Sequence, residues 1–256
     1  MHGIILSPTP QSAISLLASL SRSMTLQGDP QSEFIGTNKA MGDLTPTMTR
    51  WLETGQFNPL KNRPYNRDTL YKFRLYTPKS TLVERIQFWN DDVPIESPCL
   101  KVTFTQNFAP EAVEHLKQSE YFILCDQFSS NPKNDHFEKL AHLFLQMYSL
   151  DCALKRVAFV VHCPKVQQPT DKSTVEIAKH VFGAKCYEVF KTFCKPTTRF
   201  DFFMVDVFNL SPGSHHPCTL DQWLPHNAID PFLFAVRGLT SAKTMTLKDL
   251  EREWKD

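Results

Sequence analysis

From residue 68 onward, the chain alternates short apolar segments, rich in Phe, Tyr, Val and Ile, with segments whose apolar residues recur every three or four positions. Short apolar segments are typical of strands, and the three-to-four spacing is typical of amphipathic helices. Strands that alternate with helices form βαβ units, which build a mainly parallel sheet with helices on both faces. The pattern therefore predicts an α/β fold of the Rossmann-like kind.

The expected strands are residues 70–76, 82–89, 100–104, 121–124, 156–161, 186–190 and 200–208. The expected helices are residues 12–20, 48–52, 111–117, 135–150 and 173–182, the last opened by a capping box. The connection between the last two strands is too short for a helical crossover, so we expect an antiparallel hairpin at the C-terminal side of the sheet. We expect residues 1–36 to form an N-terminal arm with one helix, and residues 37–256 to form the α/β domain.

Composition excludes several classes of protein. The 28 Lys and Arg against 27 Asp and Glu give a net charge of +1, so a strongly basic nucleic-acid coat is excluded. No apolar run approaches the roughly 20 residues of a membrane span, so we expect no membrane contact. Seven cysteines without a CxxC pair fit a reducing compartment, which predicts a cytoplasmic protein.

Metal, hydrolase and nucleotide motifs give little support for other functions. Structural zinc needs paired ligands, and only His215, His216 and Cys218 are clustered, so we expect no metal. The chain has no Gly-x-Ser-x-Gly elbow and no P-loop. It has eight glycines, roughly half of the average usage of about 7%.

Polar residues lie at the ends of several expected strands. In sheets of this kind the ligand sits beyond the carboxyl ends of the strands. Acidic side chains after the second strand would accept hydrogen bonds from a ribose diol. The residues at strand ends are Asp91 and Asp92 after the second, Asp126 after the fourth, His162 and Lys165 after the fifth, and Asp201 at the start of the last.

Three passages resemble one known family. The first, residues 122–126, is an apolar strand that ends in Asp. The second, residues 195–205, has Lys-Pro and Thr-Arg before an apolar strand. The third, residues 230–248, contains an Arg-Gly pair. Together they resemble the FtsJ/RrmJ-like RNA ribose 2′-O-methyltransferases, most closely the version found in nidovirus replicases, including coronaviruses. The resemblance covers roughly residues 36–250 and implies a Rossmann-like methyltransferase fold.

The resemblance implies an enzyme dependent on S-adenosylmethionine (SAM) that methylates the ribose 2′-hydroxyl of RNA, as in mRNA capping. The family uses a Lys-Asp-Lys-Glu tetrad, in which a lysine with a lowered pKa orients or deprotonates the hydroxyl. Carried over by position, Lys39 is the first lysine, Asp126 the aspartate and Asp201 a shortened stand-in for the glutamate. The second lysine has no direct match, since Val160 or Val161 stands there, and Lys165 or His162 is the nearest alternative.

The resemblance also implies partners. Asp91, Asp92 and Phe128 would contact SAM, and Lys195 and Arg199 would contact RNA, capped or uncapped. A viral replicase domain of this type would work in the host cytoplasm, with a viral protein as a further candidate partner.

One departure from the family keeps an alternative open. The Gly-rich loop that follows the first strand in the family should come after Leu75, yet residues 76–81 contain no glycine. The alternative is a methyltransferase-fold protein without catalysis, serving as an RNA-binding or protein-docking module, and a third reading is an unrelated α/β interaction domain. Asp126 could also be a turn former and Lys39 a solvated lysine.

Overall fold

The fold is known from a computed structural model, which describes most of the N- and C-terminal parts of the chain and less of its middle. The described ranges are residues 2–7, 10–27, 34–36, 44–55, 68–75, 99–104, 119–129, 154–164, 167–183, 185–209, 218–238 and 244–255.

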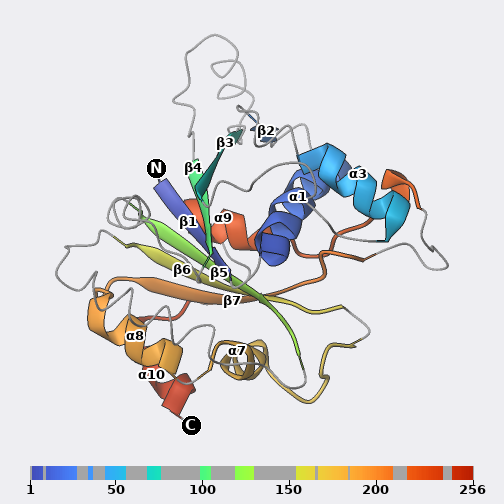
Figure 1. The fold of residues 1–256 in the computed structure, drawn as a ribbon. Helices are drawn as coiled ribbons and strands as arrows, with labels where there is room; N and C mark the ends of the chain where they lie inside the picture. The colour runs from blue at the N-terminus through green and yellow to red at the C-terminus, as the bar shows by residue number, and fades with distance from the viewer. Residues whose placement is uncertain are drawn as a thin grey trace, which may run out of the picture.

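Within these ranges, seven strands form one sheet in the order β2-β3-β4-β1-β5-β6-β7 (Figure 1). Strands β4, β1, β5, β6 and β7 are mutually parallel, whereas β3 is antiparallel to β4 and β2 is antiparallel to β3. The strands are β1 (His2–Ser7), β2 (Phe34–Gly36), β3 (Asp68–Leu75), β4 (Cys99–Phe104), β5 (Tyr121–Gln127), β6 (Arg156–His162) and β7 (Arg199–Val205).

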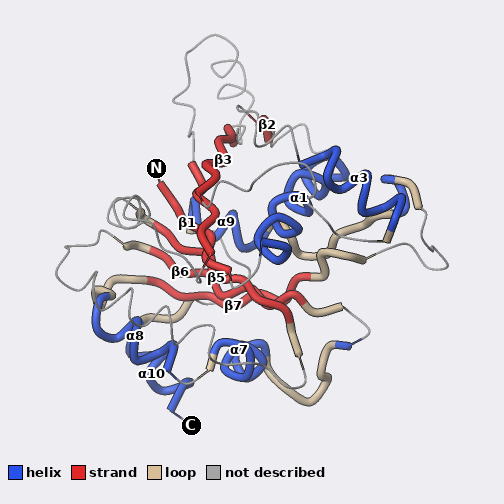
Figure 2. The backbone as a smooth tube through the Cα atoms, viewed as in Figure 1, coloured by secondary structure: helices blue, strands red, loops and turns tan. Residues whose placement is uncertain are grey.

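Helices cover both faces of this sheet, with α1 and α9 on one side and α7, α8 and α10 on the other (Figure 2). The fold is therefore α/β with a mainly parallel sheet between helical layers, as in Rossmann-like proteins. The helices are α1 (Pro10–Gln27), α3 (Leu44–Thr54), α7 (Thr174–Phe182), α8 (Lys185–Phe193), α9 (Asp230–Arg237) and α10 (Leu247–Lys255), with a 3-10 turn, η2 (Leu220–Gln222).

The two faces have separate cores, set by the alternation of side chains along each strand. The α7 face, as we call it, carries Phe122, Leu124 and Phe202 and packs on α7, α8 and α10. The α1 face carries Ile123 and Val160 and packs on α1 and α9. A residue's position in its strand therefore determines on which face of the sheet its side chain lies.

Strand β1 lies at the centre of the sheet, between β4 and β5. We expected residues 1–36 to form an arm with one helix. The helix is present as α1, but the strand before it belongs to the sheet. Ile5 and its neighbours have no exposed surface, as in other parallel strands that are covered on both faces. Gly3 is required because a Cβ there would lie 1.9 Å from Cε2 of Tyr121, the residue beside it in β5.

The predicted C-terminal antiparallel hairpin is wrong. Residues 186–190, expected to be a strand, belong to helix α8, and β7 runs parallel to β6. Aromatic and β-branched residues there suggested a strand. However, Cys186, Phe190 and Cys194 recur every four residues and are buried, which is the spacing of one helix face. Helices α7 and α8 therefore form the crossover between two parallel strands.

Most other expected elements are confirmed. The strands expected near residues 70–76, 100–104, 121–124, 156–161 and 200–208 are β3 to β7 with shifted ends, and the helices expected at 12–20, 48–52 and 173–182 are α1, α3 and α7. The elements expected at 82–89, 111–117 and 135–150 lie outside the described residues.

The capping box predicted for the helix at 173–182 is present. The Glu176 N–H donates to Ser173 Oγ at 3.2 Å, and the Ser173 N–H donates to Glu176 Oε2 at 2.6 Å. None of the described helices is both long and apolar enough to cross a membrane.

Candidate functional site at the switch edge

Doubly wound sheets bind ligands beyond the carboxyl ends of their strands, where the strand order reverses. Taken in chain order, the described parallel strands are arranged 2-1-3-4-5 across the sheet, so the order reverses between β1 and β5. Ser7 ends β1, Gln127 ends β5, and His162 ends the neighbouring β6. We call the carboxyl ends of these three strands, Ser7, Cys125–Gln127 and His162, the switch edge.

Three polar side chains of the switch edge lie on the α1 face. Leu6 pairs with Leu124, so Ser7 and Cys125 are the next residues along the two strands, and their side chains share a hydrogen bond. His162 pairs with Gln127, two residues beyond Cys125, and therefore lies on the same face. All three residues are buried.

His162 has a buried nitrogen whose hydrogen-bonding capacity is unused. The residue is 4% exposed, and its Nε2 has no hydrogen-bond partner among the described residues. Burial lowers the pKa of the imidazole to about 4, so the ring is neutral at pH 7. An unsatisfied buried polar group costs roughly 1–3 kcal/mol, and native proteins leave few of them. This nitrogen is the feature of the switch edge that most strongly indicates a ligand.

The thiol at this edge is not set up as a nucleophile. Burial raises the pKa of Cys125 well above its ordinary value, and the charge of Asp126 adds to this, while the hydrogen bond with Ser7 opposes it. Reactive cysteines are thiolates near cationic groups, and a neutral histidine supplies no positive charge. The α1 face of the edge therefore offers hydrogen-bonding groups rather than a Cys-His nucleophile.

Asp126 belongs to the switch edge, and Phe128 follows it just after the end of β5. Asp126 is half-buried, and its Oδ1 accepts a hydrogen bond of 2.7 Å from the Gln127 N–H, which is a local turn-forming contact. The Phe128 N–H donates to the His162 carbonyl at 2.8 Å. By alternation along β5, Asp126 follows Leu124 on the α7 face, so it lies on the opposite face from the His162 ring.

Asp201 lies away from Asp126. It sits between Phe200 and Phe202, which serve the α7 face, so its own side chain lies on the α1 face. Asp201 pairs with Ala158, whereas Asp126 pairs three residues further along β6, which is about 10 Å along the strand, and β6 lies between them. The structure does not bring these two carboxylates together. Asp201 is 8% exposed, and its Oδ1 accepts the Phe202 N–H at 2.8 Å.

Lys195 and Arg199, the expected RNA contacts, lie at the other end of the sheet. Arg199 is the first residue of β7, and Lys195 is in the turn that precedes it. Both side chains are exposed. A strand of seven residues spans about 20 Å, so the switch edge is a strand's length away from them.

The remaining expected site residues lie outside the described residues. These are Lys39, Asp91, Asp92 and Lys165. Their roles stay predictions. Within the described part of the chain, no three His, Cys, Asp or Glu side chains gather in a way that could hold a metal ion, and His215 and His216 lie outside that part.

Two polar residues at strand ends, Ser7 and Asp206, are not singled out by the sequence. Ser7 was missed because no strand was expected before Pro8. Asp206 follows β7, is 5% exposed, and accepts a 3.3 Å hydrogen bond from the Phe208 N–H. The signal for Asp206 was an apolar strand followed by a carboxylate, the same pattern that identified Asp126. The sequence indicates His162 only as an alternative base, because it does not reveal that Nε2 is buried without a hydrogen-bond partner among the described residues.

Comparison with models of protein families gives no match to this chain, and none of the curated proteins compared with it matches either.

Proposed function

We propose that this protein binds an adenosine-type nucleoside, with SAM as the first ligand to test, at the switch edge, and that it does so without catalysing ribose methylation. The single observation that carries the proposal is the buried, unpartnered Nε2 of His162 beside the point where strand order reverses. The resemblance described above supports SAM as the ligand, because that family binds it at the carboxyl edge of an α/β sheet.

The chemistry of His162 suits recognition of a nucleoside. A neutral imidazole carries one donor nitrogen and one acceptor nitrogen, so Nε2 can pair with either a ribose hydroxyl or an edge of adenine. Such a contact would satisfy a nitrogen that is otherwise buried without a partner, which makes binding favourable. The neighbouring hydroxyl of Ser7 adds a second polar group on the same face.

Three observations favour binding over catalysis. Asp126 and Asp201, the carboxylates expected in one tetrad, lie on opposite faces of the sheet. A histidine with a pKa of about 4 is a weak base at pH 7, far from the value that suits proton transfer. The segment 76–81, where the family has its cofactor loop, has no glycine.

Ribose 2′-O-methylation is the second candidate, and one observation favours it. Asp126 ends β5 next to the point where strand order reverses, which is where the resemblance expects the catalytic aspartate. In that case Lys39 and Lys165 would be the two lysines of the catalytic tetrad. Lys195 and Arg199 would bind the RNA backbone.

Binding is tested by isothermal titration of the full chain with SAM, its demethylated product and adenosine. We expect saturable binding and a rise in melting temperature at saturating ligand, because the ligand binds only the folded state. His162→Leu should weaken binding by about tenfold, since a buried hydrogen bond is lost. Arg199→Gln, at the far end of β7, is the control and should leave the affinity unchanged. Absence of binding by all three ligands would overturn the proposal.

Catalysis is tested by transfer of tritium-labelled methyl from SAM to capped and uncapped RNA. We expect no transfer. Transfer that disappears in Asp126→Ala would establish the second candidate and refute the non-catalytic half of the proposal, while leaving SAM binding in place.

A further inference from the structure

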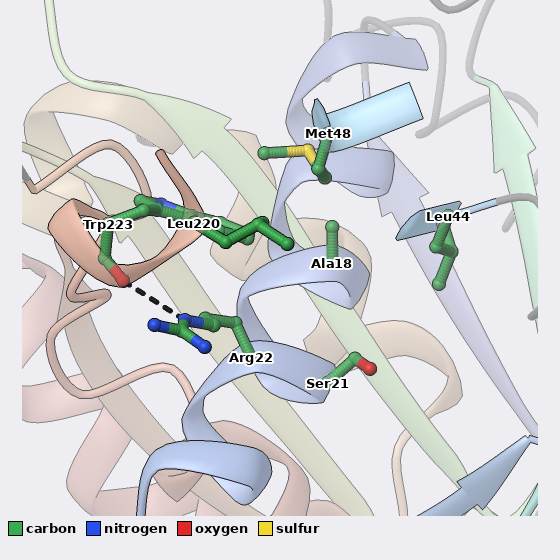
Figure 3. Close-up of a pocket in the computed structure, with 7 residues that line it drawn as sticks. All are labelled: Ala18, Ser21, Arg22, Leu44, Met48, Leu220 and Trp223. Carbon is green, nitrogen blue, oxygen red and sulfur yellow. Dashed lines mark hydrogen bonds between the residues drawn. The ribbon is translucent and has the colours of Figure 1, made fainter. Parts of the chain in front are cut away.

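A small hollow lies between α1, α3 and the segment around η2 (Figure 3). Its volume is about 200 Å³. Its polar lining is Ser21 and Arg22, both on α1. The apolar residues of its lining are Ala18, Leu44, Met48, Leu220 and Trp223.

The walls are held in place by contacts that do not need a ligand. The Trp223 Nε1–H donates to the Val207 carbonyl at 2.8 Å, and the Trp223 ring lies 6.2 Å from that of Trp51 on α3. Met48 and Trp223 belong to one buried apolar cluster. The hollow is therefore preformed, so a ligand loses little conformational entropy of the protein on binding.

Arg22 places a charge in this apolar surrounding. Its side chain is 13% exposed, and its Nε–H donates to the Trp223 carbonyl at 3.2 Å, a contact drawn in Figure 3. Its Nη2 lies 3.7 Å from Oδ1 of Asp221, whose side chain is 97% exposed, so this ion pair is weak. The guanidinium has five N–H donors, and these two contacts are its interactions among the described residues. It is therefore held in one orientation with most of its donors unused.

We propose that this hollow is a binding site for a monocarboxylate whose apolar body is about the size of one aromatic ring. A guanidinium pairs with a carboxylate through two parallel hydrogen bonds, which a solvated lysine cannot do. One guanidinium balances one negative charge, and Arg22 is the one cationic side chain among the described residues of the lining. An apolar cavity of about 150 Å³ accommodates benzene, so a hollow of this size holds one ring with a short acidic arm. The site is independent of the nucleoside proposed for the switch edge.

The test is titration of the full chain with phenylacetate, followed by the fluorescence of tryptophan and by isothermal calorimetry. Two matched ligands separate the two halves of the proposal: phenylacetamide keeps the ring and removes the charge, and acetate keeps the charge and removes the ring. We expect saturable binding of phenylacetate and at least about tenfold weaker binding of both controls. This series uses the unaltered chain, so it does not depend on any variant folding.

Arg22→Met tests the residue itself, since methionine preserves most of the apolar stem. We expect phenylacetate binding to weaken by about tenfold or more, with a melting temperature close to that of the parent. Arg50→Met, which alters an exposed arginine on α3, is the matched control and should bind phenylacetate as the parent does.

Three results would overturn the proposal. The first is no saturable binding of phenylacetate, and the second is equal binding of phenylacetate and phenylacetamide. The third is an unchanged affinity in a folded Arg22→Met variant, which would place the anion elsewhere on the protein.

Discussion

Three polar contacts at the amino ends of the parallel strands contrast with one buried nitrogen at their carboxyl ends. At the amino ends, Lys155 Nζ lies 2.5 Å from Glu120 Oε2, Arg156 Nη1 donates to the Ala235 carbonyl at 2.7 Å, and Thr198 Oγ1 donates to the Leu154 carbonyl at 3.0 Å. At the carboxyl ends, the buried Nε2 of His162 has no partner among the described residues.

This difference suggests that residues at the two ends of the sheet contribute to different properties, namely stability at the amino ends and ligand binding at the carboxyl ends. The three contacts at the amino ends help to close the fold, so changes to them should alter the free energy of unfolding and leave ligand binding alone. At the carboxyl ends, the unpartnered nitrogen of His162 costs stability in the empty protein, so a change at His162 should affect binding. Such a division is typical of doubly wound folds, whose ligands sit at the carboxyl edge.

The largest effect is expected at the amino end of β1. Gly3→Ala would place a Cβ inside the Tyr121 ring, so the free energy of unfolding should fall by about 3 kcal/mol in urea denaturation. Tyr121→Leu should recover part of this loss in the double variant, because the clash and its relief are coupled. A loss below about 1 kcal/mol would show that β1 is not packed on β5 as described.

The next effect is the pH dependence of the unfolding free energy, which His162 at the carboxyl end of β6 should cause. The His162 pKa is about 4 in the folded protein and about 6.5 in the unfolded chain, so only the unfolded chain takes up this proton between those values. The stability due to the neutral ring is fully present above pH 6.5 and is lost as pH falls toward 4, by about 3 kcal/mol.

This pH dependence is measured by chemical denaturation between pH 4 and 7. His162→Gln should flatten the slope, because the variant lacks the ring that takes up the proton. NMR of the parent gives a second readout, because the His162 ring should show no titration above pH 5. A His162 ring that titrates near pH 6.5 would contradict the burial on which the switch edge depends.

The smallest effect is expected at the amino ends of the parallel strands. Thr198 has no exposed surface, so Thr198→Val removes a buried hydrogen bond and should cost about 1 kcal/mol of unfolding free energy. Thr197→Val, at the exposed neighbouring position, is the matched control and should change stability by less than about 0.5 kcal/mol. An equal loss of unfolding free energy at the two positions would show that this hydrogen bond does not stabilise the fold.

The sequence predicted the layered α/β fold because most strands and helices have clear apolar spacing. It misled at β1, where Pro8 and Pro10 made an apolar strand resemble part of an arm. It also misled at α8, where aromatic residues that favour strands are buried on one face of a helix. In both places tertiary packing outweighed local preference.

The candidate site was predictable only in part. A carboxylate after an apolar strand identified Asp126, and its place at the carboxyl end of β5 agrees with that pattern. The face on which a residue lies depends on strand register, so the separation of Asp126 from Asp201 could not be deduced from spacing alone. The unpartnered nitrogen of His162 depends on how deeply the ring is buried, which the local sequence pattern does not give.

The most direct test of the switch edge is a titration of the isotope-labelled chain with SAM, followed by backbone amide chemical shifts. We predict changes at Ser7, Cys125–Gln127 and His162, with no change at Thr198 and Arg199. Changes confined to the amino ends of the strands, or none at saturating SAM, would contradict the proposal that the carboxyl ends form the binding site.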